Sequence, residues 1–136
     1  MKNLKAVKIK AQTFPIYVDP YNMDLLVMVN VLPKDINKIM KKAFKSAPQL
    51  PDDIIESIGK ARMNTGRYLA HDEKLYKLIH IKCDSLFSAI TTFDHEHIHL
   101  IHHILDNAGF KLSDETEEAY AYSCADAMKQ FLLSLK

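Results

Sequence analysis

Residues 90–108 read ITTFDHEHIHLIHHILDNA, and their periodicity predicts the helix around which the rest of the fold is arranged. Apolar positions recur at three- and four-residue intervals, as on an α-helix that packs one stripe against a core. The stripe consists of Ile90, Phe93, His97, Leu100, Ile101, Ile104 and Ala108. The expected caps for the start of this helix are Asp84, Ser85, Thr91 and Thr92. Gly109 follows the last turn, where glycine commonly ends a helix.

Within this helix His95, Glu96 and His99 form the pattern H-E-x-x-H. The two histidines lie one turn apart on the same face, so both imidazoles can reach a single ion. Zinc prefers tetrahedral nitrogen, sulfur and oxygen ligation, and a catalytic site keeps one position open for water, whose pKa the metal lowers to about 7. Glu96 is then expected to take the proton of that water as general base. The pattern therefore predicts two zinc ligands and a catalytic carboxylate.

The other histidines of this helix are expected to have different roles. Five of the seven histidines fall within residues 95–103, so the pattern needs support from its context. His102 and Asp106 continue the face of the two ligand histidines, but they rise along the helix axis away from an ion held there. His102 also occupies the position at which a metzincin-type site would need a glycine. His97 falls on the apolar stripe and is expected in the core, whereas His103 is expected at the surface.

A second amphipathic helix is predicted over residues 113–133. Ser113 can cap its start, and the acids that follow suit the positive end of the helix dipole. Its predicted apolar side consists of Ala121, Cys124, Ala125, Met128, Phe131, Leu132 and Leu135. Extending this stripe back by one turn places Glu117 and Glu118 at its edge. A carboxylate of this helix is therefore a candidate third ligand.

These features together resemble the small gluzincin-type metallopeptidases. In that family the third zinc ligand is a glutamate on the helix after the motif helix, often within the pattern Glu-x-x-Ala, and Glu118 to Ala121 fits this pattern. The helix, the glycine, the short loop and the EEAYAY run at residues 117–122 are also similar to those of small uncharacterised proteins of bacteriophages and mobile elements. The resemblance covers residues 92–131.

The resemblance implies a zincin-like α+β fold, with a small N-terminal β-sheet and helices followed by the metal helix and the glutamate helix. It implies zinc as the cofactor, with His95, His99 and Glu118 as ligands and Glu96 as the base. Periodicity alone places Glu117 as close to the core edge as Glu118, so the choice between the two acids stays open.

The activity that the resemblance implies is hydrolysis of a peptide bond in a peptide or protein substrate. Tyr122 is the better placed of two tyrosines to donate a hydrogen bond to a tetrahedral oxyanion, although Tyr120 and Tyr122 also fit a packing role. The alternative is a non-catalytic protein that keeps the zincin scaffold and binds a host or viral partner, because a fold alone does not fix a function. The sequence does not indicate a substrate or an oligomeric state.

The first half of the chain is predicted to contain a β-sheet and two helices. Strands are expected at residues 7–9, 16–18, 25–31, 67–70 and 75–82, the last two as a hairpin with a turn at residues 71–74. Helices are expected at residues 33–44 and 49–63, with residues 64–66 ending the second. In the implied fold, a sheet beside the metal helix offers an edge strand to an extended peptide.

The composition fits one globular domain over residues 1–136, with 48% apolar residues. A formal net charge of +1 gives no reason to expect nucleic acid as the main partner. One basic stripe is present on the helix predicted at residues 33–44, and it consists of Lys34, Lys38, Lys41, Lys42 and Lys45. A solvated helix face is the first interpretation of this stripe, and a phosphate- or membrane-binding surface is the second.

The expected location is the cytoplasm. No stretch approaches the roughly 20 apolar residues of a membrane span, and the lysine-bearing start of the chain lacks the apolar core of a signal peptide. The only two cysteines, Cys83 and Cys124, are expected as buried reduced thiols and not as a disulfide or as metal ligands.

Overall fold

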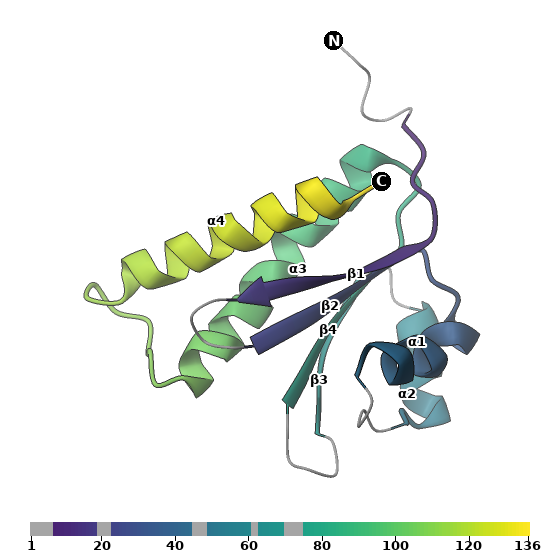
Figure 1. Cartoon of the computed structure of the whole chain (residues 1–136), viewed down its shortest axis with the longest axis horizontal. Helices are drawn as coiled ribbons and strands as arrows, with labels where there is room; N and C mark the ends of the chain where they lie inside the picture. Colours follow the sequence, from purple (N-terminus) through teal and green to yellow (C-terminus); the bar gives the residue numbers. More distant parts are fainter. Residues whose placement is uncertain (1–6, 19–22, 45–48, 61–62, 70–74) are drawn as a thin grey trace.

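A mixed four-stranded sheet separates two pairs of helices (Figure 1). The computed structural model describes residues 7–18, 23–44, 49–60, 63–69 and 75–136. The sheet has the order β1-β2-β4-β3. Its strands are β1 (Gln12–Val18), β2 (Met23–Val29), β3 (Met63–Leu69) and β4 (Leu75–Ile81). The central pair, β2 and β4, is parallel, and each edge strand runs antiparallel to its neighbour. The α+β class is therefore confirmed.

The central strand β2 is buried on both faces along residues 25–29, which explains its continuous apolar run. Leu25, Val27 and Val29 point into the core beneath α3 (Leu86–Asn107) and α4 (Glu117–Ser134). Leu26 and Met28 point to the opposite face, beneath the helices of the first half. A strand covered on both faces has no polar alternation, and residues 25–29 of β2 are accordingly apolar at every position.

The two helices of the first half lie close to the expected segments. A 3-10 turn, η1 (Pro33–Asp35), leads into α1 (Ile36–Ala43), and α2 (Asp52–Lys60) follows. The Asn37 side chain joins α1 to the segment just before α2, since its Nδ2 donates to the Leu50 carbonyl (3.1 Å) and its Oδ1 accepts from the Leu50 amide (2.7 Å). The lysines of the basic stripe within the described residues, Lys34, Lys38, Lys41 and Lys42, are all exposed.

The helix that carries H-E-x-x-H begins and ends as expected. Ser85 is the N-cap of α3, and its Oγ accepts from the Ser88 amide at 3.2 Å. Gly109 follows the helix with a φ of 91°, a left-handed conformation that glycine adopts without strain. Helix α4 then packs on α3 and β1. The rings of Phe93 and Phe131 join the two helices, stacked with centroids 4.0 Å apart.

Two predictions in the first half were wrong. Residues 7–9 belong to no strand, although the Val7 carbonyl accepts a hydrogen bond from the Leu86 amide at 2.8 Å. Residues 64–66 do not end a helix, because they lie within β3, where Gly66 pairs with Leu78 of β4. Pairing with β4 outweighs the local turn propensity of that segment. The turn expected at residues 71–74, which includes His71, lies outside the described residues, and so does Lys45.

Helix α4 starts later than predicted, and its buried face coincides with the predicted apolar side only in part. It begins at Glu117 after the N-cap Thr116, and not at Ser113. Its buried residues are Tyr120, Ser123, Ala127 and Phe131. Of the predicted apolar stripe, Phe131 is fully buried, and Cys124, Met128 and Leu135 are partly buried against the core. Ala121, Ala125 and Leu132 are exposed. The Phe131 ring contacts the rings of both Phe93 and Phe14. These contacts fix the rotation of α4 about its own axis, and in this rotation Ala121 and Ala125 face outward.

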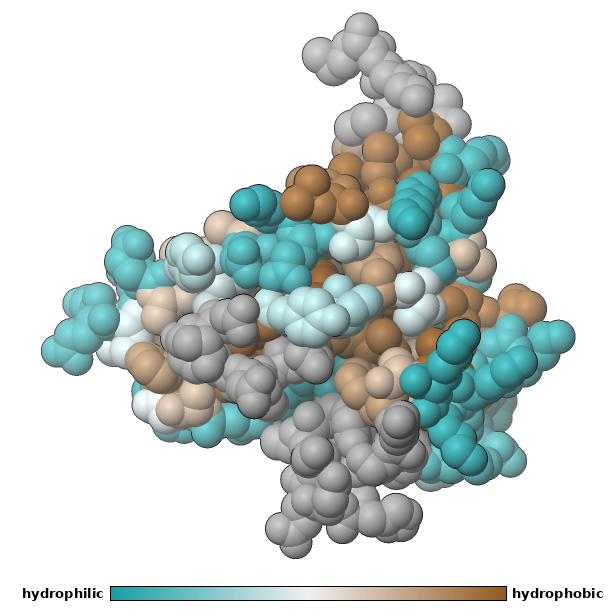
Figure 2. All heavy atoms as spheres, in the orientation of Figure 1, coloured by the Kyte–Doolittle hydropathy of each residue, from teal (hydrophilic) through white to brown (hydrophobic). Residues whose placement is uncertain are grey.

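The surface is polar at both ends of the molecule. Figure 2 shows hydrophilic side chains at the two ends of the long axis and apolar side chains between them. Several large apolar residues are more than half exposed, and they include Ile98, Leu112 and Leu133. In the described part of the chain, no helix combines the length and the apolar character that crossing a membrane requires.

Candidate metal centre

The two histidines of H-E-x-x-H lie side by side on the exposed face of α3. The Nε2 atoms of His95 and His99 are 3.3 Å apart, and their ring centroids are 5.1 Å apart. Two nitrogens that each lie about 2.0–2.1 Å from a tetrahedral zinc ion are separated by about 3.3–3.4 Å. The pair therefore has the spacing of two ligands of one zinc ion.

Glu96 lies next to this pair but is mostly covered by the fold. Its side chain is 10% exposed, and its Oε1 lies 3.8 Å from the Nε2 of His95. Helix α3 crosses β3 and β4, so the side of the helix that carries Glu96 is buried while His95 projects to solvent. The carboxylate thus reaches the imidazole pair from the covered side of the helix. Such a position suits a group that exchanges a proton beside a bound ion.

The structure does not bring a third ligand to the histidine pair. Among the described residues, no three His, Cys, Asp or Glu side chains are arranged to hold one metal ion. Glu118 is exposed on α4, two positions before Tyr120, whose ring lies 5.6 Å from that of His102 on α3. Residues two apart on a helix point about 200° apart, so Glu118 points away from this contact. Glu117 instead lines a groove between the helices. The role of Glu118 as a ligand stays a prediction.

His97 lies in the core, as its place on the apolar stripe predicts. It is 3% exposed, and its ring stacks on that of Phe93 with centroids 4.9 Å apart. Its Nδ1 lies 2.9 Å from the Phe93 carbonyl oxygen, which can only accept, so this nitrogen is the donor of the pair. His97 is therefore oriented by its own helix and does not belong to the pair on the exposed face.

The last two turns of α3 carry polar groups that are engaged elsewhere. His102 is exposed and His103 is half-buried, although the sequence suggested a surface position for His103. Asp106 accepts a hydrogen bond from Lys111 at 2.6 Å, and this bond lowers the pKa of the carboxyl group. The expectation that His102 and Asp106 lie away from the ligand pair fits this arrangement.

The two tyrosines of α4 have different surroundings. Tyr120 is buried, its hydroxyl donates to the Phe110 carbonyl, and burial raises the pKa of its phenol, with the charge of Asp106 adding to the shift. Tyr122 is 68% exposed. The packing role is thus confirmed for Tyr120, and the catalytic role of Tyr122 stays a prediction.

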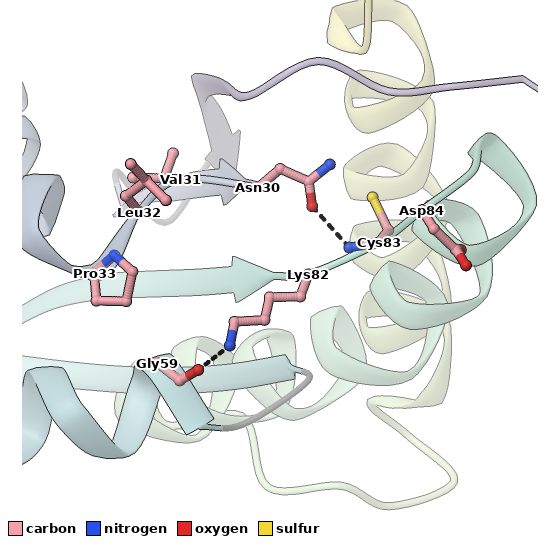
Figure 3. A pocket seen from close by; sticks show the side chains of 8 residues that line it. All are labelled: Asn30, Val31, Leu32, Pro33, Gly59, Lys82, Cys83 and Asp84. Atoms are coloured by element: carbon pink, nitrogen blue, oxygen red, sulfur yellow. Dashed lines mark hydrogen bonds between the residues drawn. The ribbon is translucent and has the colours of Figure 1, made fainter.

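A second candidate site, which the sequence did not indicate, lies where the parallel strands end. A cavity of about 520 Å³ opens beside the carboxyl ends of β2 and β4, where parallel sheets commonly bind ligands (Figure 3). Asn30 and Cys83 lie on one side, and the Asn30 Oδ1 accepts from the Cys83 amide at 2.8 Å. Lys82 turns across the cavity and donates to the Gly59 carbonyl. Two hydrogen bonds thus join lining residues to one another, and Asp84 at the rim is exposed.

The cysteines form no disulfide, as expected, and both are half-buried. Burial raises the pKa of the Cys124 thiol, and the charge of Asp94 adds to this shift. A raised pKa keeps the thiol protonated and unreactive at neutral pH.

No family model matches the chain, and neither a curated protein nor a solved structure is similar to it. The candidate metal centre therefore rests on its own geometry and on the motif.

Proposed function

We propose that the protein is a zinc-dependent peptide-bond hydrolase with a zincin-like fold. The observation that carries the proposal is the 3.3 Å separation of the His95 and His99 Nε2 atoms, with the Glu96 carboxylate beside them. Helical geometry explains the spacing of the two imidazoles, and this spacing allows both to bind one tetrahedral zinc ion.

The residues present fit zinc in part. Two neutral imidazoles supply nitrogen ligands of the kind that catalytic zinc sites use, and such sites take a third ligand from elsewhere in the protein. The family resemblance assigns that role to Glu118, and Glu117 is the neighbouring alternative. Both acids are exposed at the first turn of α4. Binding would require this turn to approach the middle of α3.

Four residues would take part in hydrolysis of the peptide bond. His95 and His99 would hold the ion at the surface of α3. When bound, zinc would polarise the scissile carbonyl and make water a better nucleophile. Glu96 would accept a proton from the attacking water and pass it to the leaving amine, and its cover by the sheet would hold the carboxylate in one place. Tyr122 would donate to the developing oxyanion.

The sheet offers one edge on which a peptide can lie. In the described part of the chain, β3 pairs with β4 alone, and α3 packs against both strands. The other edge is closed by α4, since the Gln130 side chain bonds both the amide (2.9 Å) and the carbonyl (2.7 Å) of Tyr17 in β1. An extended substrate could therefore add to β3, beside the helix that carries the histidine pair.

Replacement of Glu96 by Gln tests the catalytic part of the proposal. Hydrolysis of a mixture of quenched fluorescent peptides should fall at least about 100-fold, because general base catalysis contributes about 10²–10⁴-fold. Zinc content and the circular dichroism spectrum should stay the same. Glu115→Gln, at an exposed acid before α4, is the matched control and should retain full activity. Equal hydrolysis by wild type and Glu96→Gln would overturn the assignment of the base.

A second function is favoured by one observation. Only two of the three expected ligands are brought together among the described residues. A protein that keeps the scaffold and binds a host or viral partner needs no complete metal site. Glu96→Gln distinguishes the two functions, since partner binding should be indifferent to a change that retains the size and most of the hydrogen bonding of the side chain.

A further inference from the structure

The side of α1 that faces solvent is lined by lysines. The described members of the basic stripe, all of them exposed, are Lys34, Lys38, Lys41 and Lys42. Ile36 and Met40 lie on the other side of the helix and are only 0% and 1% exposed. At about 100° per residue, the three lysines of α1 point about 120–160° away from Ile36. The rotation of α1 that buries its apolar side therefore turns these lysines outward together.

The stability of α1 itself explains only part of this arrangement. Lys41 and Lys42 lie in the last turn, where cations suit the negative end of the helix dipole. Lys38 lies in the first turn, where a cation is unfavourable, and α1 contains no acid that could pair with it. It is also three and four residues from the other two, a spacing at which like charges repel. By contrast, Lys60 of α2 pairs with Glu56 at 2.9 Å.

The positive charge of the basic stripe is not neutralised by the described part of the fold. None of its four described lysines makes an ion pair with a described residue. The exposed acids of the neighbouring helix are Asp52, Asp53 and Glu56, of which Glu56 pairs with Lys60. Four more exposed acids lie near the start of α4, at the opposite end of the molecule from α1 (Figure 1), and they are Asp114, Glu115, Glu117 and Glu118. The formal net charge of +1 thus combines a basic end and an acidic end.

A lipid surface fits the basic stripe better than a nucleic acid does. Clusters of about four to eight lysines or arginines on an amphipathic helix bind anionic headgroups. A bilayer is a plane, so a convex row of lysines can meet it along its whole length. Nucleic-acid-binding domains carry a marked basic excess, and they use arginine or aromatic side chains to read or stack bases. The net charge here is +1, and the stripe consists of lysines alone.

We propose that the basic stripe of α1 binds the anionic headgroup surface of a phospholipid bilayer. The apolar side of α1 is packed in the core with β2, so the helix would lie on the headgroups without inserting. Each lysine would raise the affinity about fivefold, the equivalent of about 1 kcal/mol. Helix α3 covers the other face of the sheet, so this binding goes beyond the proposed hydrolase and needs no metal.

Sedimentation of the full chain with lipid vesicles in EDTA tests the proposal. One set of vesicles contains phosphatidylcholine alone, and the other replaces a third of it by phosphatidylglycerol. The chain should bind the anionic vesicles at least about 50-fold more tightly than the neutral ones, because several lysines act together. Salt at about 0.5 M should abolish this binding, since it screens exposed charges.

Substitutions in the basic stripe locate the binding surface. Lys38→Gln and Lys42→Gln should each weaken binding to the anionic vesicles about fivefold, and the double variant about 25-fold. Both lysines are exposed, so each variant should retain the circular dichroism spectrum of the wild type. Lys129→Gln, at an exposed lysine of α4, is the matched control and should leave binding unchanged.

Several results would overturn the proposal. These are absence of binding to the anionic vesicles, equal binding to both kinds of vesicle, and equal binding by the wild type and the double variant. Binding to duplex DNA without binding to vesicles, lost in the double variant, would assign the basic stripe to nucleic acid instead. Because the assay contains no metal, its failure leaves the zinc hydrolase untouched, and loss of zinc binding leaves the lipid surface untouched.

Discussion

Asn30 shows how one residue holds the end of β2 in place. Its φ is 56°, a left-handed conformation that asparagine tolerates better than most residues. Its Oδ1 accepts from the Cys83 amide (2.8 Å), its Nδ2 donates to the Ile9 carbonyl (3.1 Å), and its own amide donates to the Ile81 carbonyl (2.8 Å). One side chain therefore ties together three segments that are distant in sequence.

Replacement of Asn30 separates the backbone effect from the side-chain effect. Asn30→Ala should lower the free energy of unfolding by about 2–4 kcal/mol, since it removes two part-buried hydrogen bonds and places alanine at a positive φ. Asn30→Gly should lose the same bonds without the strain and cost about 1 kcal/mol less than alanine. Urea unfolding of the three proteins measures the difference. Equal stability of the alanine and glycine variants would contradict the assigned strain.

His80 makes stability depend on pH. The residue is fully buried in β4, and its Nε2 lies 3.1 Å from the Val31 carbonyl oxygen, so the neutral ring carries its proton there. Burial lowers the pKa of His80, and the charge of Lys82 lowers it further, against the opposing effect of the Val31 hydrogen bond. The unfolded chain, with an ordinary histidine pKa of about 6.5, therefore binds more protons than the native state just below that pH.

The sign of this effect follows from linkage. Because the unfolded state binds more protons, the free energy of unfolding rises with pH between the lowered pKa of His80 and about 6.5. The contribution of His80 to stability is therefore present above about pH 6.5 and is lost as the pH falls through this range. In His80→Leu this contribution is absent, so its stability should change less than that of the wild type between pH 7 and pH 5. Urea titrations at both pH values measure the change. An equal loss in both proteins would exclude His80 as the cause.

At the scale of elements, α4 protects the edge strand β1 of the sheet. The Gln130 amide group bonds to both backbone atoms of Tyr17, as a neighbouring strand would. At the other end of β1, the Gln12 side chain bonds to the Lys136 amide (2.9 Å) and carbonyl (3.0 Å). Unpaired edges invite pairing with another chain, and these contacts block that pairing along β1.

Removal of the Gln130 side chain should leave the edge of β1 less protected by α4. Gln130→Ala is expected to lower the free energy of unfolding by about 1–2 kcal/mol, because two hydrogen bonds are lost at an exposed edge. Hydrogen exchange at the Tyr17 amide should become faster, while exchange in β4 stays unchanged. Lys129→Ala, at the preceding exposed position, is the control. Unchanged exchange at Tyr17 would show that the side chain does not protect the edge.

Some elements could be predicted from the sequence because their signals are local. The period of α3 and its Gly109 stop depend on neighbouring residues, and the structure confirms both. Ser85, one of the four expected caps, is the N-cap. The buried face of α4 could not be predicted in this way, since alanines give little preference for one face. It depends on the contact of Phe131 with Phe93 and Phe14, which joins residues far apart in the sequence.

The same division applies to the candidate metal centre at the scale of the whole molecule. The approach of His95 and His99 follows from the helix repeat alone, so the sequence predicts it directly. The position of a third ligand depends on how α4 packs against α3. The rotation of α4 about its own axis places Glu117 at the groove between the two helices and leaves Glu118 pointing to solvent. Sequence periodicity left these two acids equivalent, and tertiary packing distinguishes them.

The most direct measurement is the zinc content of protein purified without a histidine tag or added metal, in wild type, His99→Ala, Glu118→Ala and Glu117→Ala. If His95, His99 and Glu118 are the zinc ligands, wild type and Glu117→Ala should each contain about one zinc ion per chain, and the other two variants should contain none. Each protein should retain its circular dichroism spectrum. Absence of zinc from all four correctly folded proteins would contradict the proposed zinc site and leave H-E-x-x-H as a coincidence in a histidine-rich helix.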